Sequence, residues 1–184
     1  MIPFKGECRA PSRVLSVGLS ALFIVMLSSY SFASSDTPGK VIAGWVEKIS
    51  IKNQSYALKA KLDSGAKTSS VHAENIELFK RDGQRWVRFQ LLLEGAEGAE
   101  GEIETLTLEK SRVRRVKIKE HDGDHDSRPV VELDICFDGR PYAVEFTLTD
   151  RSAFIYPVLL GRRFLAGVAV VDPEVTFLTQ AQCR

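Results

Sequence analysis

The sequence predicts an all-β fold, because short apolar or alternating stretches are separated by turn residues along most of the chain. Two Asp-Gly pairs, at 82–83 and 138–139, are strong turn signals. The second pair joins 130–137 to 142–148 in the clearest predicted hairpin. Helical patterns are scarce, and the best candidate for a short helix is 162–165, near the C-terminus.

Two predicted strand regions lie before residue 63. Residues 41–51 predict a first pair of strands, with Trp45 and Val46 as core anchors. Residues 56–62 alternate apolar residues with lysines, which is the period of a half-buried strand. One face of this strand would carry Leu58, Ala60 and Leu62.

The later elements are shorter or less regular. Residues 76–79 predict a short helical or extended link, and 94–102 form an acidic, low-complexity loop between two strands. The pair Arg114-Arg115 breaks the alternation of its strand, which indicates a bulge. Further strands are expected over 86–93, 105–108, 113–119 and 168–171.

The first 33 residues are typical of a secretory signal peptide. Basic residues precede a largely apolar run over 14–27, and Ser31-Phe32-Ala33 offers small residues where a signal peptidase reads the chain. We expect cleavage after Ala33. A retained membrane anchor is the alternative, which the modest apolar length disfavours. Residues 34–40 would form a flexible leader to one domain over 41–184, with no stable membrane insertion after cleavage.

Charge and cysteine content limit the function classes further. The formal net charge is +1, a near-neutral balance that argues against nucleic acid as a partner. Cys136 and Cys183 remain after the signal peptide is removed. An oxidising compartment permits them to form a disulfide, and two separate thiols are equally compatible with the sequence.

A candidate catalytic motif lies in Leu62-Asp63-Ser64-Gly65-Ala66, at the end of the strand predicted over 56–62. A carboxylate at a strand end, followed by a small hydroxyl residue and glycine, is how aspartic peptidases hold their catalytic Asp. Hydrolysis of a peptide bond by this chemistry needs two carboxylates, and the motif occurs once. A chain with one copy therefore needs a second chain. The alternative is an ordinary Asx turn that only reverses the chain.

A second stretch, 156–165, is an apolar run that ends in Gly161 and leads into the predicted helix. With this stretch, the chain resembles, from Gly44 to about Pro173, bacterial retropepsin-like aspartic peptidases that are often labelled ATP-dependent zinc proteases. The segments that carry the resemblance are 44–47, 62–73, 86–89, 128–130, 148–151, 157–162 and 171–173.

The resemblance implies a closed retropepsin-like (acid protease) barrel and a homodimer in which two Asp63 carboxylates form the catalytic dyad. Ser64, Gly65, Ala66 and Thr68 would form the active-site loop. Ser64 stands where the family usually has Thr, and its hydroxyl would join the two loops. The residues implied to support the loop from behind are Leu159, Leu160, Gly161 and Arg162. The resemblance also implies a bacterial periplasmic location and a contextual link to ATP-grasp enzymes that add glutamate to proteins or peptides.

The zinc and ATP parts of the family label find no support in the sequence. A phosphate-binding Gly-x-x-x-x-Gly-Lys-Ser/Thr loop and a His-Glu-x-x-His zinc motif are both missing. His121 and His125 lie in the acidic segment 120–126, whose spacing fits neither a helical metal site nor a calcium loop. We interpret this segment as a solvated turn, which leaves incidental binding of a divalent ion open, and we expect no cofactor and no metal site.

The substrate would lie under a mobile hairpin, the flap, as the resemblance implies. The candidates are 94–102 and 121–127, and we prefer the second because it precedes Arg128-Pro129. Lys67 and Arg128 are candidate substrate contacts. Lys67, with Lys59, Lys61, Arg114 and Arg115, would favour acidic or glutamate-rich peptides, and a solvated basic face is the alternative.

The sequence therefore predicts an aspartic endopeptidase that acts on a peptide or protein substrate. The alternative is a non-catalytic periplasmic module that binds a peptide or glutamate and serves a glutamate ligase or a membrane system. A zinc peptidase ranks third.

Overall fold

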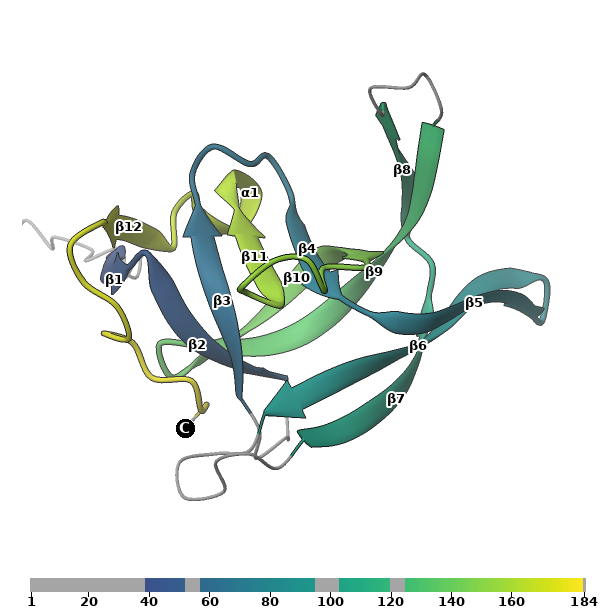
Figure 1. Ribbon diagram of the computed structural model, residues 1–184, viewed down its shortest axis with the longest axis horizontal. Helices are drawn as coiled ribbons and strands as arrows, with labels where there is room; N and C mark the ends of the chain where they lie inside the picture. Colours follow the sequence, from purple (N-terminus) through teal and green to yellow (C-terminus); the bar gives the residue numbers. More distant parts are fainter. Residues whose placement is uncertain (1–38, 52–56, 95–102, 120–124, 184) are drawn as a thin grey trace, which may run out of the picture. The chain divides into compact units, whose positions relative to one another are not determined.

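The computed structural model describes residues 39–51, 57–94, 103–119 and 125–183 (Figure 1). The predicted signal peptide, most of the leader, the acidic loop 95–102 and the segment 120–124 lie outside these residues. No helix in the described ranges is long and apolar enough to span a membrane.

The all-β prediction with a short helix near the C-terminus is confirmed. The described elements are β1 (Val41–Gly44), β2 (Val46–Ile51), β3 (Ala57–Asp63), β4 (Ser69–His72), β5 (Glu74–Arg81), β6 (Gln84–Glu94), β7 (Ile103–Ser111), β8 (Arg114–Lys119), β9 (His125–Phe137), β10 (Arg140–Thr149), β11 (Val158–Gly161), α1 (Arg162–Leu165) and β12 (Ala169–Asp172).

Six strands close into a barrel, in the order β11, β4, β10, β9, β2 and β3. The closing contact is the parallel pairing of β11 with β3, in which Gly161 lies opposite Asp63. Strands β5, β6 and β7 extend the sheet beyond the ring, and β8 pairs with the first part of β9 (Figure 1). The closed barrel implied by the resemblance is therefore present.

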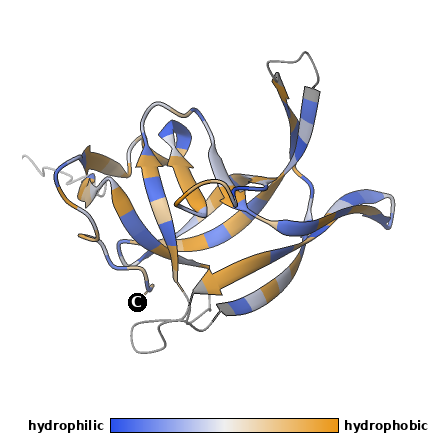
Figure 2. Cartoon of the chain, viewed as in Figure 1, coloured by the Kyte–Doolittle hydropathy of each residue, from blue (hydrophilic) through white to orange (hydrophobic). Residues whose placement is uncertain are grey.

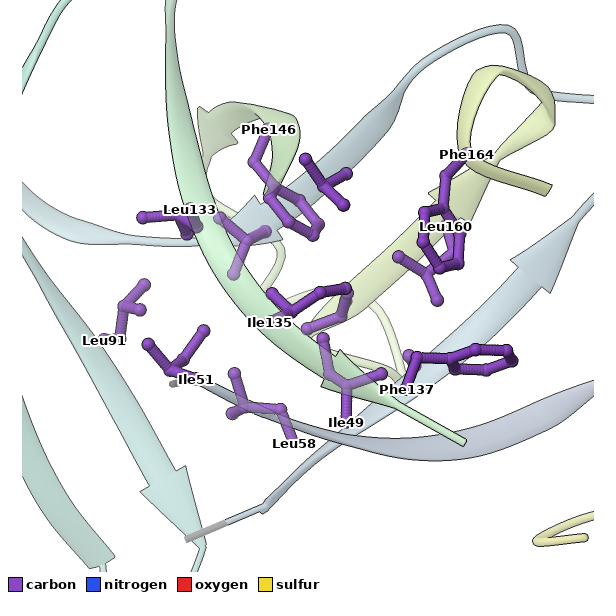
Figure 3. Close-up of a cluster of buried hydrophobic side chains, with 14 of the residues drawn as sticks. Ile49, Ile51, Leu58, Leu91, Leu133, Ile135, Phe137, Phe146, Leu160 and Phe164 are labelled. Atoms are coloured by element: carbon purple, nitrogen blue, oxygen red, sulfur yellow. The ribbon is translucent and has the colours of Figure 1, made fainter. Parts of the chain in front are cut away.

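The core lies inside this barrel. Along β3, Leu58, Ala60 and Leu62 are buried and the residues between them are not, as the alternation predicts, and the colours of Figure 2 alternate along this strand. Figure 3 shows Leu58 beside Ile49 and Ile51 of β2, with Leu91 of β6 beyond Ile51. The inward faces of strands far apart in the sequence thus share one apolar core, whose burial is the main term that favours folding.

The Asp-Gly pairs at 82–83 and 138–139 form the turns of hairpins. Asp82 and Gly83 have φ of 51° and 76°, and Asp138 and Gly139 have φ of 51° and 70°. Two successive residues with positive φ match the right-handed twist of the strands they join, and Asp and Gly accept this conformation readily. The first turn joins β5 to β6 and the second joins β9 to β10.

Two sequence predictions about local structure are wrong. Trp45 is 36% exposed and is not a core anchor, whereas Val46 is 1% exposed. Trp45 is displaced from the core because it lies between β1 and β2, where the chain changes sheets. Arg114-Arg115 is not a bulge, since β8 pairs with β9 in continuous register from residue 114 onward.

The Arg114-Arg115 pattern has a different explanation. Arg114 begins β8, and its guanidinium donates hydrogen bonds to Glu145 of β10 at 2.7 and 2.9 Å, while Arg115 is exposed. The observed irregularity lies in β5, between Glu74 and Glu77. The predicted link over 76–79 is extended and belongs to that strand.

The C-terminal segment is bound to β2 by a buried carboxylate. Glu47 is fully buried and accepts backbone N–H bonds from Gly44 at 2.6 Å and from Leu178 and Thr179 at 3.0 Å. The Thr179 hydroxyl donates a further bond at 2.8 Å. Because a buried carboxylate is costly unless it is hydrogen-bonded, these donors make Glu47 a fixed anchor for the last residues of the chain.

A disulfide joins Cys136 of β9 to Cys183, with a Cα to Cα distance of 5.3 Å. Of the two outcomes that the sequence left open, the paired one is observed. The bridge and Glu47 together hold the C-terminal segment against the outside of β2 and β9.

The loop after β3 is packed tightly against Gly161. A Cβ atom added at Gly161 would lie 2.6 Å from the backbone carbonyl carbon and oxygen of Thr68 and 2.9 Å from its nitrogen. Backbone atoms cannot move aside as the end of a side chain can. Glycine is therefore required here by steric contact, and the position of β11 depends on it.

We expect loss of the disulfide to destabilise the protein without changing the fold. The bridge spans a sequence separation of 47, and the chain-entropy relation for a loop of this length gives about 4 kcal/mol. Cys183→Ser should therefore lower the free energy of unfolding in urea by about this amount. A reducing agent should do the same to the parent and nothing to the variant. An unchanged parent midpoint in reducing agent would contradict the pairing.

We expect Gly161→Ala to destabilise the barrel by about 1–3 kcal/mol or more, because the new methyl group overlaps the Thr68 backbone. Gly39→Ala is the matched control, since a Cβ at Gly39 meets nothing within 4 Å. Denaturant unfolding of both variants measures the difference. Equal stability of the two would show that the loop adjusts freely around position 161.

Candidate active site

Asp63 is the last residue of β3 and begins the loop that leads to β4. Its Oδ1 accepts the backbone N–H groups of Gly65 at 2.9 Å and Ala66 at 3.2 Å. These hydrogen bonds form an Asx-type turn. Asp63 is therefore both at the end of a strand, as the catalytic motif predicts, and in the turn that was the alternative interpretation. The hydrogen bonds fix the carboxylate at the mouth of the loop.

The surroundings of Asp63 keep its carboxylate ionised in the single chain. Partial burial acts to raise the pKa of Asp63. The N–H groups of Ala66 and Gly65 and the Lys61 ammonium at 3.5 Å act in the opposite direction, and together they outweigh the burial. The pKa of Asp63 therefore lies below its usual value. The single chain thus presents an ionised carboxylate, which accepts a proton and cannot donate one.

The segment after β11 holds the Asp63 loop from behind. Arg162 donates its backbone N–H to the Ala66 carbonyl at 2.8 Å, and its guanidinium donates to the carbonyls of Ser64 at 3.1 Å and Gly65 at 2.9 Å. The N–H of Gly161 donates to the Ser69 hydroxyl at 3.1 Å. Residues 98 positions apart in the chain are therefore joined at the loop.

The structure brings most of the sequence-predicted site residues together around this loop. Leu159 and Leu160 pair with Lys61 and Leu62, directly behind it. Ser64, Gly65 and Lys67 are exposed, and Thr68 is half-buried. The outer face of the loop, which carries Ser64, is thus open to solvent.

Arg128 lies on β9, two residues after Asp126, with which its Nε forms an ion pair. Arg128 contributes an electrostatic effect at Arg151, and so does Asp63. Arg128 and Asp63 are therefore each within electrostatic range of Arg151, although the three residues come from β9, β3 and the segment after β10. Of the preferred flap segment, 121–127, residues 125–127 are the first residues of β9, and 121–124 lie outside the described residues.

Arg151 was given no role by the sequence reasoning, although 148–151 was among the segments that carry the resemblance. Its side chain is 8% exposed, and its backbone N–H donates to His72 Nδ1 at 2.8 Å. The signal that could have found it is an arginine directly after an apolar strand, where a buried charge needs a specific reason.

Apolar side chains border the same region. Phe154 and Ile155 are 61% and 87% exposed, and the Trp45 and Tyr156 rings form an edge-to-face contact at 5.7 Å. The Trp45 carbonyl accepts the N–H of Leu62, next to Asp63. Exposed aromatic and aliphatic groups beside a carboxylate suit the binding of a peptide.

A separate groove of about 430 Å³ lies on the α1 side of the loop and does not include Asp63. Thr68 and Ser69 form one wall, and residues of β10 and α1 form the other. It is therefore not the site of the carboxylate chemistry.

The two-stranded sheet of β1 and β12 exposes an apolar face. Ile42 and Val170 are directly opposite each other in this parallel pair and are 66% and 54% exposed. In the described part of the chain, β1 and β12 form ladder pairs with each other alone.

Within the described ranges, no group of three or more His, Cys, Asp or Glu side chains converges as a metal site would require. His121 and the acidic residues 122 and 124 lie outside those ranges.

Two longer proteins contain a region that is similar in sequence to this chain. A protein named as a probable alpha-L-glutamate ligase from Shewanella pealeana is 40% identical over 121 residues, which is 66% of this chain and 26% of that protein. A second such protein, from Parasynechococcus marenigrum, is 36% identical over 137 residues, with 73% and 28% covered. The chain thus spans about a quarter of the length of these curated relatives.

A solved structure is similar over nearly its whole length. The Legionella pneumophila protein Lpg0085, of unknown function, has a TM-score of 0.62 and 35% identity, with 76% of this chain and 98% of that chain covered. The family model described as the retropepsin-like aspartic endopeptidase RimB matches residues 42–182. This range contains the Asp63 loop, the β11 and α1 support and Cys136, and it ends one residue before Cys183. The chain belongs to the RimB-like family of retropepsin-like aspartic endopeptidases.

Proposed function

We propose that the protein is an aspartic endopeptidase that hydrolyses peptide bonds with a water molecule held between the Asp63 carboxylates of two identical subunits. The observation that carries the proposal is the geometry of Asp63, an ionised carboxylate fixed by two backbone N–H groups at the open end of a loop. The motif occurs once in the sequence, so the second carboxylate comes from a second copy.

The chemistry of the dyad follows from placing two such carboxylates close together. Because two like charges at short distance cannot both remain ionised, the pair takes up one proton, and one of its two pKa values rises. The ionised carboxylate takes a proton from water, and water oxygen attacks the peptide carbonyl carbon. The protonated carboxyl supplies a proton as the C–N bond breaks and the amine leaves. The Asp63 that keeps its lowered pKa is the base, and the Asp63 whose pKa is raised on dimerisation is the acid.

The β1 and β12 face is our proposed dimer interface. Exposed Ile42 and Val170 provide the apolar surface, and strand edges at this sheet provide backbone groups that a second copy can pair with. An interface of this kind related by a two-fold axis would leave the Ser64 hydroxyls free to join the two active-site loops. Ser64 is exposed, as this role requires.

We further propose that the β8 and β9 hairpin is the flap and that substrates are acidic or glutamate-rich peptides. Arg128 lies on this hairpin and close enough to Arg151 to affect it, so the hairpin base borders the Asp63 region. Lys61 and Lys67 add positive charge beside Asp63. The names of the relatives, probable alpha-L-glutamate ligases, are consistent with glutamate as the substrate element.

A periplasmic location remains part of this proposal. The features of residues 1–33 support export through a cleaved signal peptide. The disulfide between Cys136 and Cys183 suits an oxidising compartment.

A binding module without catalysis is the second candidate, and one observation favours it. In the curated relatives, the matching region is about a quarter of a protein named for ligation. A domain in that position could present a peptide or glutamate to the ligase part, with Asp63 as a hydrogen-bonding group.

We expect Asp63→Asn to lower kcat/KM for peptide hydrolysis by at least about 1,000-fold, because neither a base nor an acid remains in the dyad. Asn keeps the size of the side chain, so the fold and the dimer should persist. Asp134→Asn makes the same chemical change at an exposed position of β9 and should have no effect. Hydrolysis by Asp63→Asn at the parent rate would exclude the dyad mechanism and favour the binding module.

We expect the double variant Ile42→Lys, Val170→Lys to weaken dimerisation by about 100-fold or more, because four charges per dimer would have to lose water at the interface. Peptidase activity should fall in parallel. Leu78→Lys, at an exposed apolar position of β5, is the control. Sedimentation and activity are measured on the same samples across a concentration series. A double variant that remains dimeric and active would place the interface on another face.

A further inference from the structure

The side chain of Arg151 is held in a fixed position by neutral groups. Its Nε donates to the Tyr156 carbonyl at 3.2 Å, and its Nη1 donates to the Ser70 hydroxyl at 3.0 Å. The Phe154 ring lies 4.6 Å from the guanidinium carbon. With 8% of the residue exposed, the guanidinium is oriented in advance and most of its hydration is lost.

The charge of Arg151 is not matched by an ion pair. Among the residues that the structure describes, the arginines in ion pairs with carboxylates are 81, 88, 114 and 128, and Arg151 is not among them. Burial lowers the pKa of Arg151, the nearby Arg128 lowers it further, and Asp63 acts in the opposite direction. A buried charge without a partner is costly, so a fold retains one where a ligand completes it.

The separation between the Arg151 contact and Asp63 follows from the strand register. Ser70, which binds the guanidinium, lies opposite Leu159 of β11, and Leu159 lies opposite Lys61 of β3. Neighbouring strands are about 4.8 Å apart, so the backbone at Ser70 lies roughly 10 Å across the sheet from Lys61. Asp63 is two residues, or about 7 Å, further along β3, so the backbones of Ser70 and Asp63 are roughly 12 Å apart. This separation equals about four residues of an extended peptide at about 3.3 Å each.

A planar guanidinium with two fixed hydrogen bonds is suited to one ligand chemistry, a carboxylate held by parallel N–H groups. Of the lysines beside Asp63, Lys67 is exposed and Lys61 is half-buried, and they attract acidic peptides without the fixed geometry of a planar guanidinium. Arg151 is buried and oriented, and it can therefore distinguish a carboxylate from the isosteric amide.

We propose that Arg151 is a specificity-determining residue that binds a carboxylate of the substrate within about four residues of the bond to be cleaved. The carboxylate comes from a glutamate side chain or from the C-terminus of the peptide. This inference rests on the proposed endopeptidase function and names the residue that selects the substrate.

The first test changes only the substrate. Short quenched-fluorescent peptides carry a single glutamate moved stepwise through a sequence of alanine and glutamine, each with a free or an amidated C-terminus, and mass spectrometry locates the cleaved bond. We expect glutamate at one position near that bond to raise kcat/KM by about 10- to 100-fold over glutamine, the range for a hydrogen-bonded charge. If the increase instead depends on a free C-terminus, so that the amidated peptides are cleaved about 10- to 100-fold more slowly whatever the position of glutamate, the terminal carboxylate is the ligand. Equal rates for every peptide would overturn the proposal.

The second test changes the protein. In Arg151→Gln, the ratio of kcat/KM for the glutamate and glutamine peptides should fall to about one, and Arg151→Lys should retain part of it because the charge remains. Ser70→Ala removes one bond that orients the guanidinium and should lower the ratio without removing it. Arg140→Gln, at an exposed arginine at the other end of β10, should leave the ratio unchanged.

Folding and catalysis are controlled separately. Circular dichroism and unfolding curves show whether Arg151→Gln folds, and if it does not, Arg151→Lys and Ser70→Ala supply the comparison. A folded Arg151→Gln variant with the parent ratio would overturn the proposal.

If the parent hydrolyses none of the peptides, the endopeptidase proposal fails and the subsite is tested by binding. The same peptides are then titrated into Asp63→Asn protein and followed by calorimetry. A glutamate peptide that binds about 10- to 100-fold tighter than its glutamine counterpart, with the difference lost on adding Arg151→Gln, supports the subsite. Equal binding of both peptides overturns it.

Discussion

The close contact between Gly161 and the backbone of Thr68 is the constraint on which the active-site region depends. It allows β11 to lie parallel to β3 with Gly161 opposite Asp63, which closes the barrel. From that position, Arg162 binds the carbonyls of Ser64 and Gly65. The same contact thus positions both the closing strand of the fold and the loop that holds the carboxylate.

In the proposed dyad mechanism, the electrostatics of Asp63 leave a single chain without a catalytic acid. Its backbone hydrogen bonds and Lys61 stabilise the ionised form, which serves as a base but cannot supply a proton. A second carboxylate reverses this preference at one of the two sites, because the charges repel. Dimerisation through the β1 and β12 face would therefore act as the step that creates an acid. The exposed apolar surface of β1 and β12 would then be required for the chemistry of Asp63, because it would bring the second carboxylate into place.

The fold could be predicted to a large extent because its signals are local. Alternation along β3 and the Asp-Gly turns depend on side chains a few residues apart. Trp45 was misassigned because burial of a large aromatic residue is decided by the sheet change around it. The prediction of a bulge at Arg114-Arg115 was wrong for a similar reason, since the position of Arg114 is explained by its hydrogen bond to Glu145 on another strand. The role of Arg151 was missed because its neighbours lie on β3, β4 and β9.

The sequence by itself determined the strand periods, the turns and the candidate motif around Asp63, since each is a property of neighbouring residues. Tertiary structure alone decided which cysteines pair and which backbone N–H groups donate to Glu47. It also decided which charged side chains lie near Asp63 and Arg151. These outcomes depend on distances between residues far apart in the chain. Such distances exist only after the barrel has closed, so no local pattern records them.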